Sequence, residues 1–297
     1  MHVRQPSYRL PTPRPELELV EQPELSSAFM LSGAHRADVP QGWSYPRHDH
    51  PYFELCLLLE GEQQVRLTGN TLTQGPGDLL LLTPFEAHAA STDVASRFYC
   101  LHFDVDDIDL RRLLCLAGTR VWCAHEPAMQ EVRPWLDRMA ALQVGPADSA
   151  LRWRLAMGAA LTGLFAALAV ACEARVEQAP ALPQAALQTA ASLAALIERE
   201  VDQGAQETPL EAAIRRLGYA PDYGNALFKQ VYGMSAQHYR SSLKLRRAKL
   251  LLLNTQLSVA QVSEQLGYAN GAHFSRQFKR WSGMSPQAFR RTQNVAA

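Results

Sequence analysis

The sequence predicts an α+β protein of two domains: a small N-terminal β-barrel with flanking helices, and a C-terminal domain made only of helices. Three observations predict this architecture. Residues 24–125 contain short β-type runs separated by turn residues. Residues 127–174 change to a helical period. Residues 187–297 contain an internal repeat of helix-turn-helix form. A chain of 297 residues is long enough for about two hydrophobic cores.

The composition excludes several classes of protein. The chain is 47% hydrophobic and 20% charged, unlike a disordered or collagen-like chain. Its five cysteines are odd in number and contain no C-x-x-C, which argues against a zinc ribbon or a secreted disulfide framework. The first residues lack the apolar core of a signal peptide, so we expect no secretory export and a cytoplasmic location.

The N-terminal half is expected to begin with an arm and to continue as a barrel. Residues 1–23 are rich in proline and acidic residues and have no periodicity, so they predict an arm. Residues 24–125 alternate apolar runs with Gly, Pro and Asn turn chemistry, which is typical of a small barrel or sandwich. The predicted strands include residues 53–60, 64–68, 78–83 and 97–103.

A helical segment, residues 126–175, is expected to follow the barrel and to serve in packing or dimerisation. Within it, residues 155–172 form a run of 18 residues without a charge. This length is at the lower limit for a helix that spans a membrane. Its large side chains form one apolar stripe at helical spacing, namely Leu161, Leu164, Phe165 and Leu168. We therefore expect a buried or dimer-forming helix and no membrane contact. Residues 176–186 contain two prolines and little bulk, and predict a linker.

The net charge of zero hides two parts of opposite sign. Residues 187–297 contain 14 Lys and Arg against 7 Asp and Glu, a net charge of +7, so residues 1–186 carry −7. A basic C-terminal domain predicts a polyanion as its partner.

The internal repeat indicates which polyanion. Residues 217–220 (LGYA) recur 49 residues later, and residues 233–235 (GMS) recur 50 residues later. Each copy has the pattern of a helix, a glycine-containing turn, a second helix and a glycine stop, and the copies span about residues 208–234 and 258–284. Residues 236–253 predict a connecting helix between them. The second helix of such a motif fits the major groove of double-stranded DNA, so two motifs would read adjacent segments about 10 bp apart.

The basic domain resembles the AraC/XylS family of bacterial transcription regulators over about its last 105 residues. The resemblance depends on the connecting-helix pattern Lys244-Leu245-x-x-Ala248-x-x-Leu251-Leu252-x-x-Thr255. It depends further on Gly267-Tyr268, Phe274-Ser275-Arg276, Phe278-Lys279, Gly283, Pro286 and Phe289-Arg290. It implies a DNA-binding regulator, usually an activator that works with RNA polymerase, with an N-terminal effector and dimerisation domain. We therefore expect a homodimer.

Departures from the family pattern fall mainly in the first motif. Gly224 stands where a packing Leu is usual, and Ala226 stands where an Arg is usual. Glycine within a helix costs roughly 1 kcal/mol relative to alanine, so we expect this reading helix to be the weaker one.

Base recognition is therefore assigned chiefly to the second motif. The predicted base-reading residues are Asn270, Gly271, Ala272, His273 and Arg276, with Asp222 and Asn225 in the first motif. Arg276 can pair with O6 and N7 of guanine. The predicted phosphate contacts are Lys229, Lys279, Arg280, Arg290 and Arg291. Phe228, Phe274 and Phe278 are expected in the core, and Trp281 in packing.

The N-terminal half has a second motif, G-x5-His48-x-His50-x3-Glu54-x6-G. It matches the first motif of cupins, small β-barrels whose motif residues bind a divalent metal. On one strand, His48, His50 and Glu54 would point to the same face. His88 is a possible fourth ligand, although Glu86 stands where a glycine is usual. Three imidazoles and a carboxylate suit Zn, Fe, Mn or Ni.

Three interpretations of these histidines stay open. Sensor domains of the regulator family also resemble cupins, and many keep a His-rich strand without metal. The first interpretation is an organic effector inside the barrel, with no cofactor required. Its pocket would consist of Trp43, Tyr45, Arg47, His48, His50, Glu54, His88 and Tyr99. The second is a metal sensor, and the third is a cupin metalloenzyme. We expect no enzyme, because no independent catalytic pair is evident. His102 and His125 have no partner pattern and are expected to be structural or on the surface.

Overall fold

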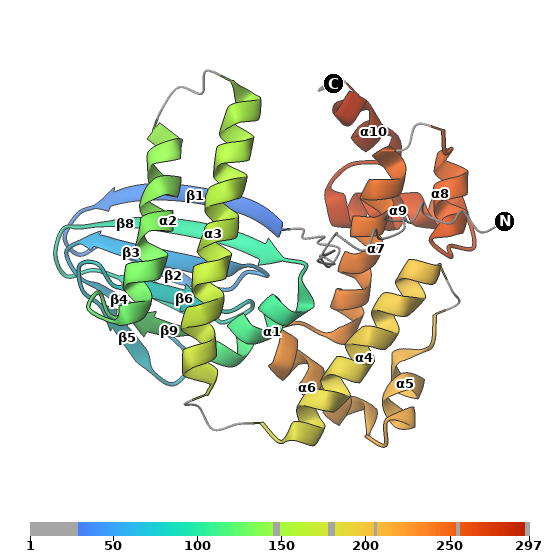
Figure 1. Cartoon of the computed structure of the whole chain (residues 1–297), viewed down its shortest axis with the longest axis horizontal. Coiled ribbons are helices and arrows are strands. Elements are labelled where there is room, and N and C mark those ends of the chain that lie inside the picture. Colours follow the sequence, from blue (N-terminus) through green and yellow to red (C-terminus); the bar gives the residue numbers. More distant parts are fainter. Residues whose placement is uncertain (1–28, 145–148, 178–181, 205–206, 254–255, 295–297) are drawn as a thin grey trace, which may run out of the picture.

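The computed structural model describes residues 29–144, 149–177, 182–204, 207–253 and 256–294. The expected arm, residues 1–23, lies outside the described residues. The described part of the chain forms a β-domain with three helices, followed by a helical domain (Figure 1). The predicted fold class, α+β with a helical C-terminal domain, is confirmed.

The β-domain consists of two antiparallel sheets. The larger has the order β1-β8-β3-β6-β9, that is Phe29–Val39, Ser96–Val105, Phe53–Glu60, Leu79–Leu82 and Arg120–Trp122. The smaller has the order β2-β7-β4-β5, that is Ser44–His48, His88–Ser91, Gln63–Arg66 and Thr71–Gln74. The four predicted strands are found as β3, β4, β6 and β8. Strand β3 has the predicted bounds, and the ends of the other three differ by one or two residues.

Strands β3 and β8 are buried on both faces, and side chains alternate between two environments. Leu55 and Leu101 belong to the core that the larger sheet shares with the helices. Cys56 and Cys100, one position further along each strand, belong to the core between the two sheets. A strand of period two delivers successive side chains to opposite faces. The face toward the smaller sheet therefore carries the candidate ligand-binding residues.

Three helices cover the outer face of the larger sheet. They are α1 (Ile108–Ala117), α2 (Pro127–Val144) and α3 (Ala150–Val176), and α2 and α3 lie side by side across the sheet (Figure 1). The expected stripe Leu161, Leu164, Phe165 and Leu168 is buried. Gly163 permits the close approach of the helices, because a Cβ there would lie 2.6 Å from the Trp135 ring.

Among the described helices, α3 alone is long and apolar enough to cross a membrane by length and composition. Its most apolar window has a mean hydropathy of 2.1, and 44% of that window is buried inside the protein. The buried side of α3 is the stripe that packs on the larger sheet, as expected for a core helix.

The predicted linker is shorter than expected. Helix α3 ends at Val176, and α4 (Gln184–Gln203) already begins inside the span assigned to the linker, with Pro183 at its N-cap. Proline is tolerated there because the first residues of a helix have no intrahelical acceptor for their N–H groups. Ala186 and Ala190 then pack in the core of the helical domain.

The helical domain contains both predicted helix-turn-helix motifs. The first is α5 (Leu210–Arg216) and α6 (Pro221–Tyr232), and the second is α8 (Val259–Gln265) and α9 (Gly271–Ser282). Helix α7 (Ala236–Leu253) connects them, and α10 (Pro286–Asn294) follows. Gly233 and Gly283 end the reading helices in the left-handed conformation, at φ of 69° and 78°. Each motif has its own core.

The two domains meet where α1 packs on α6. The Arg111 side chain is buried and its Nε donates to the Tyr232 carbonyl oxygen at 2.9 Å. A Cβ on Gly233 would lie 2.8 Å from the Cys115 Sγ, so the end of α6 sits directly against α1. Phe85, at a positive φ of 63°, stacks edge-on against His238 of α7.

Candidate functional site

Helix α9 has three distinct faces. Phe274 and Phe278 are buried and anchor it in the core of the second motif. At 100° per residue, Ala272, Arg276 and Lys279 point away from that core, and all three are exposed. The outward face of α9 therefore presents a small residue and two cations, as expected for a helix that enters a groove of DNA.

The remaining predicted residues at the start of α9 have other roles in the helix. Asn270 is the N-cap, and its Oδ1 accepts from the His273 backbone N–H at 2.7 Å. Its side-chain amide N–H groups stay available as donors. His273 is exposed, and its ring packs edge-on against Tyr268 at 5.4 Å between centroids. Gly271 occupies the first helical position and is half-buried.

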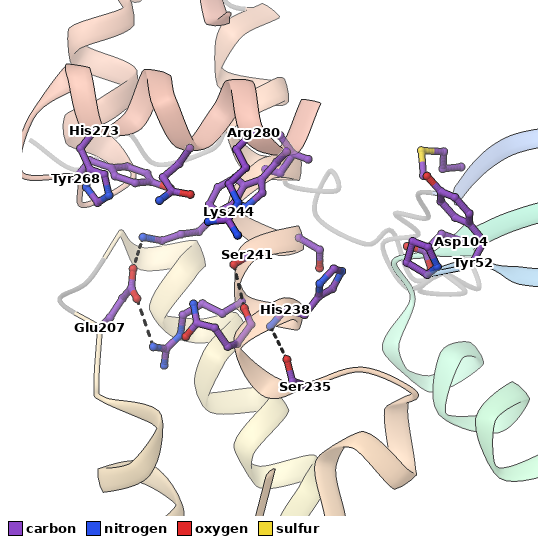
Figure 2. A pocket seen from close by; sticks show the side chains of 18 residues that line it. Tyr52, Asp104, Glu207, Ser235, His238, Ser241, Lys244, Tyr268, His273 and Arg280 are labelled. Atoms are coloured by element: carbon purple, nitrogen blue, oxygen red, sulfur yellow. Dashed lines mark hydrogen bonds and ion pairs between the residues drawn. The ribbon is translucent and has the colours of Figure 1, made fainter. Parts of the chain in front are cut away.

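A cavity of about 680 Å³ lies between α7, α9 and the β-domain (Figure 2). His273 and Arg280 of α9 line one wall, and Tyr52 and Asp104 of the β-domain line the opposite wall. Near the base of the cavity, Lys244 is paired with Glu207, which also accepts from Arg240 Nη1 at 3.3 Å. The lateral face of α9 thus looks toward the β-domain, whereas the outward face does not line this cavity.

In the first motif, the outward face of α6 carries Asp222, Ala226 and Lys229, all exposed. Asn225 is half-buried. The position of Arg276 in the second motif corresponds to Ala226 here, 50 residues earlier. The outward face of α6 therefore has one positive and one negative side chain, and it is less basic than that of α9.

The unusual Gly224 is explained by packing. It is buried, and a Cβ there would overlap Cγ2 of Ile214 on α5. The corresponding positions of the second motif hold Ser263 and Phe274, both buried. The large residue is on the first helix in one motif and on the second helix in the other. Ile214 thus fills the space that the missing side chain of Gly224 leaves.

The predicted phosphate contacts divide into two groups. Lys229, Lys279, Arg280 and Arg291 are exposed. Arg290 is half-buried, and its Nε donates to the Leu252 carbonyl oxygen at 3.1 Å, near the end of α7. The prediction that Arg290 contacts phosphate is therefore not supported, because its guanidinium caps a helix within the domain. Trp281 is half-buried beside the interdomain cavity, in agreement with a packing role.

A second cavity, of about 390 Å³, lies between the two sheets of the β-domain. We call it the sheet cavity. Its polar lining includes His48 at the end of β2, Glu54 on β3, His88 at the start of β7 and His102 on β8. The expectation that one strand carries His48, His50 and Glu54 was wrong. The chain passes from the smaller to the larger sheet between His48 and Glu54, with His50 in the connection, and the facing sheets bring them together.

Glu54 is the centre of the imidazole cluster. Its Oε2 lies 3.1 Å from Nε2 of His50, 3.4 Å from Nε2 of His102 and 3.6 Å from Nε2 of His88. The ring centroids of His48 and His88 are 4.2 Å apart. His102, expected to be structural or on the surface, is therefore a member of the cluster. It faces Glu54 in the β3–β8 register, which no local sequence signal reveals. His125 is exposed, as expected.

Backbone carbonyls set the orientation of three of these rings. Nδ1 of His48, His50 and His88 lies 3.0, 3.1 and 2.8 Å from the carbonyl oxygens of Pro46, Tyr52 and Glu86. A carbonyl oxygen only accepts, so each Nδ1 carries the proton and directs Nε2 toward the other members of the cluster. A neutral Nε2 and a carboxylate oxygen both lack a proton, so the contacts of Glu54 with His50 and His88 need a cation between them, either a proton or a metal ion.

Burial and neighbouring charges have opposite effects on the pKa values of this cluster. Burial alone would raise the pKa of Glu54, but hydrogen bonds from His102 and His50 and the nearby imidazoles hold it well below its usual range. The hydrogen bond to Glu54 raises the pKa of His50. Burial lowers the pKa of His88, and it lowers that of His35, which stacks on His102. The Glu54 carboxylate is thus ionised, His50 takes up a proton more readily than a free imidazole, and His88 and His35 resist protonation.

The other predicted pocket residues are divided. Trp43 and Tyr45 line the sheet cavity, as predicted. Arg47 instead directs its guanidinium to the Thr68 hydroxyl on the outside. Tyr99 was wrongly assigned to the pocket: it lies between Phe98 and Cys100 and so faces the opposite core, against the helices. The lining residues that the sequence analysis missed include His35, Cys56, Gln63, Cys100 and His102.

A β-domain with a ligand-sized cavity, joined to two helix-turn-helix motifs, defines a transcription regulator with a ligand-binding and a DNA-binding domain. Comparison with known proteins supports this class. Residues 34–165 match the AraC-like ligand binding domain, and residues 214–292 match a helix-turn-helix domain. The chain belongs to the AraC/XylS family of transcriptional regulators.

Similar proteins extend over most of the chain. The uncharacterized HTH-type transcriptional regulator YobQ of Bacillus subtilis is 25% identical over 84% of this chain and 90% of its own length. The HTH-type transcriptional activator RhaS of Escherichia fergusonii is 25% identical over 90% of this chain and 94% of its own length. The uncharacterized HTH-type transcriptional regulator YtdP of Bacillus subtilis is 37% identical over 28% of this chain. The match covers only 11% of the length of YtdP. The crystal structure of ToxT from Vibrio cholerae covers 88% of this chain and 96% of its own, at 9% identity and a TM-score of 0.40.

Proposed function

We propose that this protein binds specific sequences of double-stranded DNA through α9 and α6, under the control of a small-molecule effector in the sheet cavity. The observation that supports it best is the outward face of α9. Ala272, Arg276 and Lys279 are exposed there while Phe274 and Phe278 hold the opposite side in the core. A rigid helix with cations on its free face fits the major groove.

The exposed residues take different parts in this contact. Arg276, at the centre of the outward face, pairs with a guanine, and Ala272 and Gly271 allow close approach or contact a thymine methyl group. Asn270 and His273 contribute at the start of the helix. Asp222 and Asn225 serve the first motif, where a carboxylate accepts from cytosine N4. The phosphate contacts are Lys229, Lys279 and Arg280, which position the protein without reading sequence.

The sheet cavity is the proposed effector site. Its volume of about 390 Å³ is in the range of small-molecule pockets, which run from about 300 to 1,000 Å³. Trp43, Tyr45 and Phe98 offer apolar and aromatic walls, whereas Glu54 and His88 offer polar groups in one corner. An organic ligand with one polar end fits this arrangement. The protein acts by binding alone in this proposal, without enzyme activity.

The proposals for assembly and location are supported by the family and by α3. RhaS is described as a transcriptional activator, and we propose the same role here, through contact with RNA polymerase in the cytoplasm. Leu155 and Val170 are 66% and 62% exposed on the side of α3 that faces away from the core. A second copy of the chain would cover this uncharged surface, so we propose a homodimer through α3.

A metal-sensing regulator is the second candidate. It is favoured by the three Nδ1 contacts to backbone carbonyls, because metal-binding histidines usually donate their other ring N–H in this way. His48, His50, Glu54 and His88 would hold a divalent ion such as Zn, Fe, Mn or Ni, and the ion would supply the positive charge that the cluster needs.

One experiment tests the function and separates the candidates. The full-length protein, with its metal content measured by elemental analysis, selects DNA from a random-sequence library with and without added metal. Enrichment of a defined sequence supports the DNA-binding proposal, and its absence in all conditions overturns it. Selective binding without bound metal supports an organic effector, whereas one ion per chain that changes DNA affinity supports the metal sensor.

A further inference from the structure

Two cysteines lie face to face inside the sheet cavity. Cys56 on β3 is paired in register with Cys100 on β8, and the next inward pair along the same strands is Glu54 with His102. These four side chains form a two-by-two block on one face of the larger sheet, and all four line the sheet cavity. The exposed fractions of Cys56 and Cys100 are only 2% and 3%.

The ligand atoms of this block are close enough to share one ion. Sγ of Cys56, Sγ of Cys100 and a carboxylate oxygen of Glu54 all lie within 4.8 Å of one another. Bonds from zinc are about 2.3 Å to sulfur and about 2.0–2.2 Å to oxygen. The ligand atoms of a tetrahedral zinc ion therefore lie somewhat closer to one another than 4.8 Å. Small rotations of the three side chains would bring their ligand atoms to that spacing.

The surroundings distinguish this pair from ordinary core cysteines. Cys172 packs in the core between the larger sheet and the helices, away from the sheet cavity. Cys56 and Cys100 instead border a cavity and a buried carboxylate. Without an ion, Cys56 Sγ donates weakly to Gln63 Oε1 at 3.5 Å. A carboxylate beside two potential thiolates in a buried place attracts a cation, and sulfur donors select a soft or borderline-soft one.

We propose that Cys56, Cys100 and Glu54 bind one zinc-class metal ion, with His102, which is paired with Glu54 in the β3–β8 register, as a candidate fourth ligand. Both thiols lose their protons to solvent when the ion binds, so binding releases two protons per ion. This site shares Glu54 with the metal-sensor candidate but has two thiolates in place of the imidazoles of His48, His50 and His88. It goes beyond the proposed function and does not depend on it, because ion binding to the purified chain defines it, whatever DNA the protein selects.

The test uses Co²⁺ as a spectroscopic probe on the full-length, reduced protein. We expect one Co²⁺ per chain and a sulfur-to-cobalt charge-transfer absorption in the near ultraviolet. One equivalent of Zn²⁺ should displace the Co²⁺ and abolish this absorption. Cys56→Ser and Cys100→Ser should each weaken binding by at least about 10–100-fold, the loss that even outer-shell partners cause. Cys172→Ser, a buried thiol outside the cavity, is the matched control and should keep the absorption.

Two results would overturn the proposal. One is that the wild-type protein binds neither Co²⁺ nor Zn²⁺. The other is that Co²⁺ binds without the charge-transfer absorption, which would assign the ion to imidazole and carboxylate ligands alone. Because a serine variant can fail to fold, X-ray absorption at the zinc edge of the wild-type protein provides a second count of sulfur ligands. Two sulfurs are expected, and none would contradict the site. Enrichment of a defined DNA sequence, which tests the DNA-binding proposal, is scored independently of these readouts.

Discussion

Arg111 of the β-domain donates from its Nε to the carbonyl oxygen of Tyr232, the last residue of α6, across 2.9 Å. The same guanidinium is paired with Asp104 on β8 and lies over the Phe53 ring, 5.2 Å from its centroid. Phe53 precedes Glu54 in the chain, and Asp104 lies two residues after His102. One buried side chain therefore connects the strands that carry the proposed effector site with the second helix of the first helix-turn-helix motif.

Replacement of Arg111 should weaken the contact between the domains. Arg111→Ala leaves the Tyr232 carbonyl and the Asp104 carboxylate without their partner, and we expect a loss of about 3–5 kcal/mol in the free energy of unfolding. Chemical denaturation measures it. Arg133→Ala is the matched control, because its pair with Asp137 on α2 is exposed, lies away from α6 and contributes at most about 1 kcal/mol. Equal losses in the two variants would contradict the role of Arg111.

Arg276 and Lys279 share the outward face of α9, but their replacement should affect DNA binding in different ways. Arg276→Ala should relax specificity at one base position by about 1–3 kcal/mol, whereas Lys279→Ala should weaken all sequences similarly and reduce the salt dependence. Binding titrations on selected and random DNA at several salt concentrations measure both effects. Arg138→Ala, an exposed cation on α2, is the control. The assignment would be wrong if both variants lost the same affinity for selected and random DNA.

The packing of Gly224 against Ile214 predicts a compensating pair. Gly224→Leu should destabilise the first motif by about 1–3 kcal/mol, because the new side chain overlaps Ile214. Ile214→Ala should also destabilise it, by about 2–5 kcal/mol through an unfilled space. The double variant should lose less than the two single losses together, because one change makes room for the other. Strict additivity in chemical denaturation would refute this account.

Tyr99→Phe should leave the fold and the proposed ion site of the sheet cavity intact. Tyr99 faces the helices, and its hydroxyl has no hydrogen-bond partner among the described residues. Removal of an unpaired buried hydroxyl is expected to be neutral or slightly stabilising. Thermal unfolding and Co²⁺ titration check the two parts of this prediction. Cys100→Ser serves as the comparison, since it removes a proposed ion ligand that lines the sheet cavity. A loss of Co²⁺ binding in Tyr99→Phe would show that the residue belongs to the site after all.

The exposed side of α3 should form the interface of the proposed homodimer. Leu155→Glu, or Val170→Glu, places a charge on the exposed apolar surface and should convert a dimer into monomers, while the buried stripe of the helix is untouched. Analytical ultracentrifugation measures the change. Thr162→Ser, an exposed and conservative replacement on the same helix, should leave the assembly unchanged. A monomeric wild-type protein would contradict the proposed interface.

Much of the architecture was readable from local pattern. The duplicated LGYA and GMS blocks predict both helix-turn-helix motifs and α7, because turn glycines and helical periodicity are properties of neighbouring residues. The stripe from Leu161 to Leu168 predicts the buried side of α3 for the same reason. His48, His50, Glu54 and His88 were found by spacing, although the assumed single strand was wrong.

What only the tertiary structure decided is the pairing of segments far apart in the chain. The β3–β8 register places Glu54 opposite His102 and Cys56 opposite Cys100, and it turns Tyr99 away from the cavity. A shift of one residue would have sent all of these side chains to the other face, and the sequence of either strand alone does not specify that register. Local spacing therefore identified the candidate ligands on one segment. Long-range packing of the two sheets determined which partners they meet.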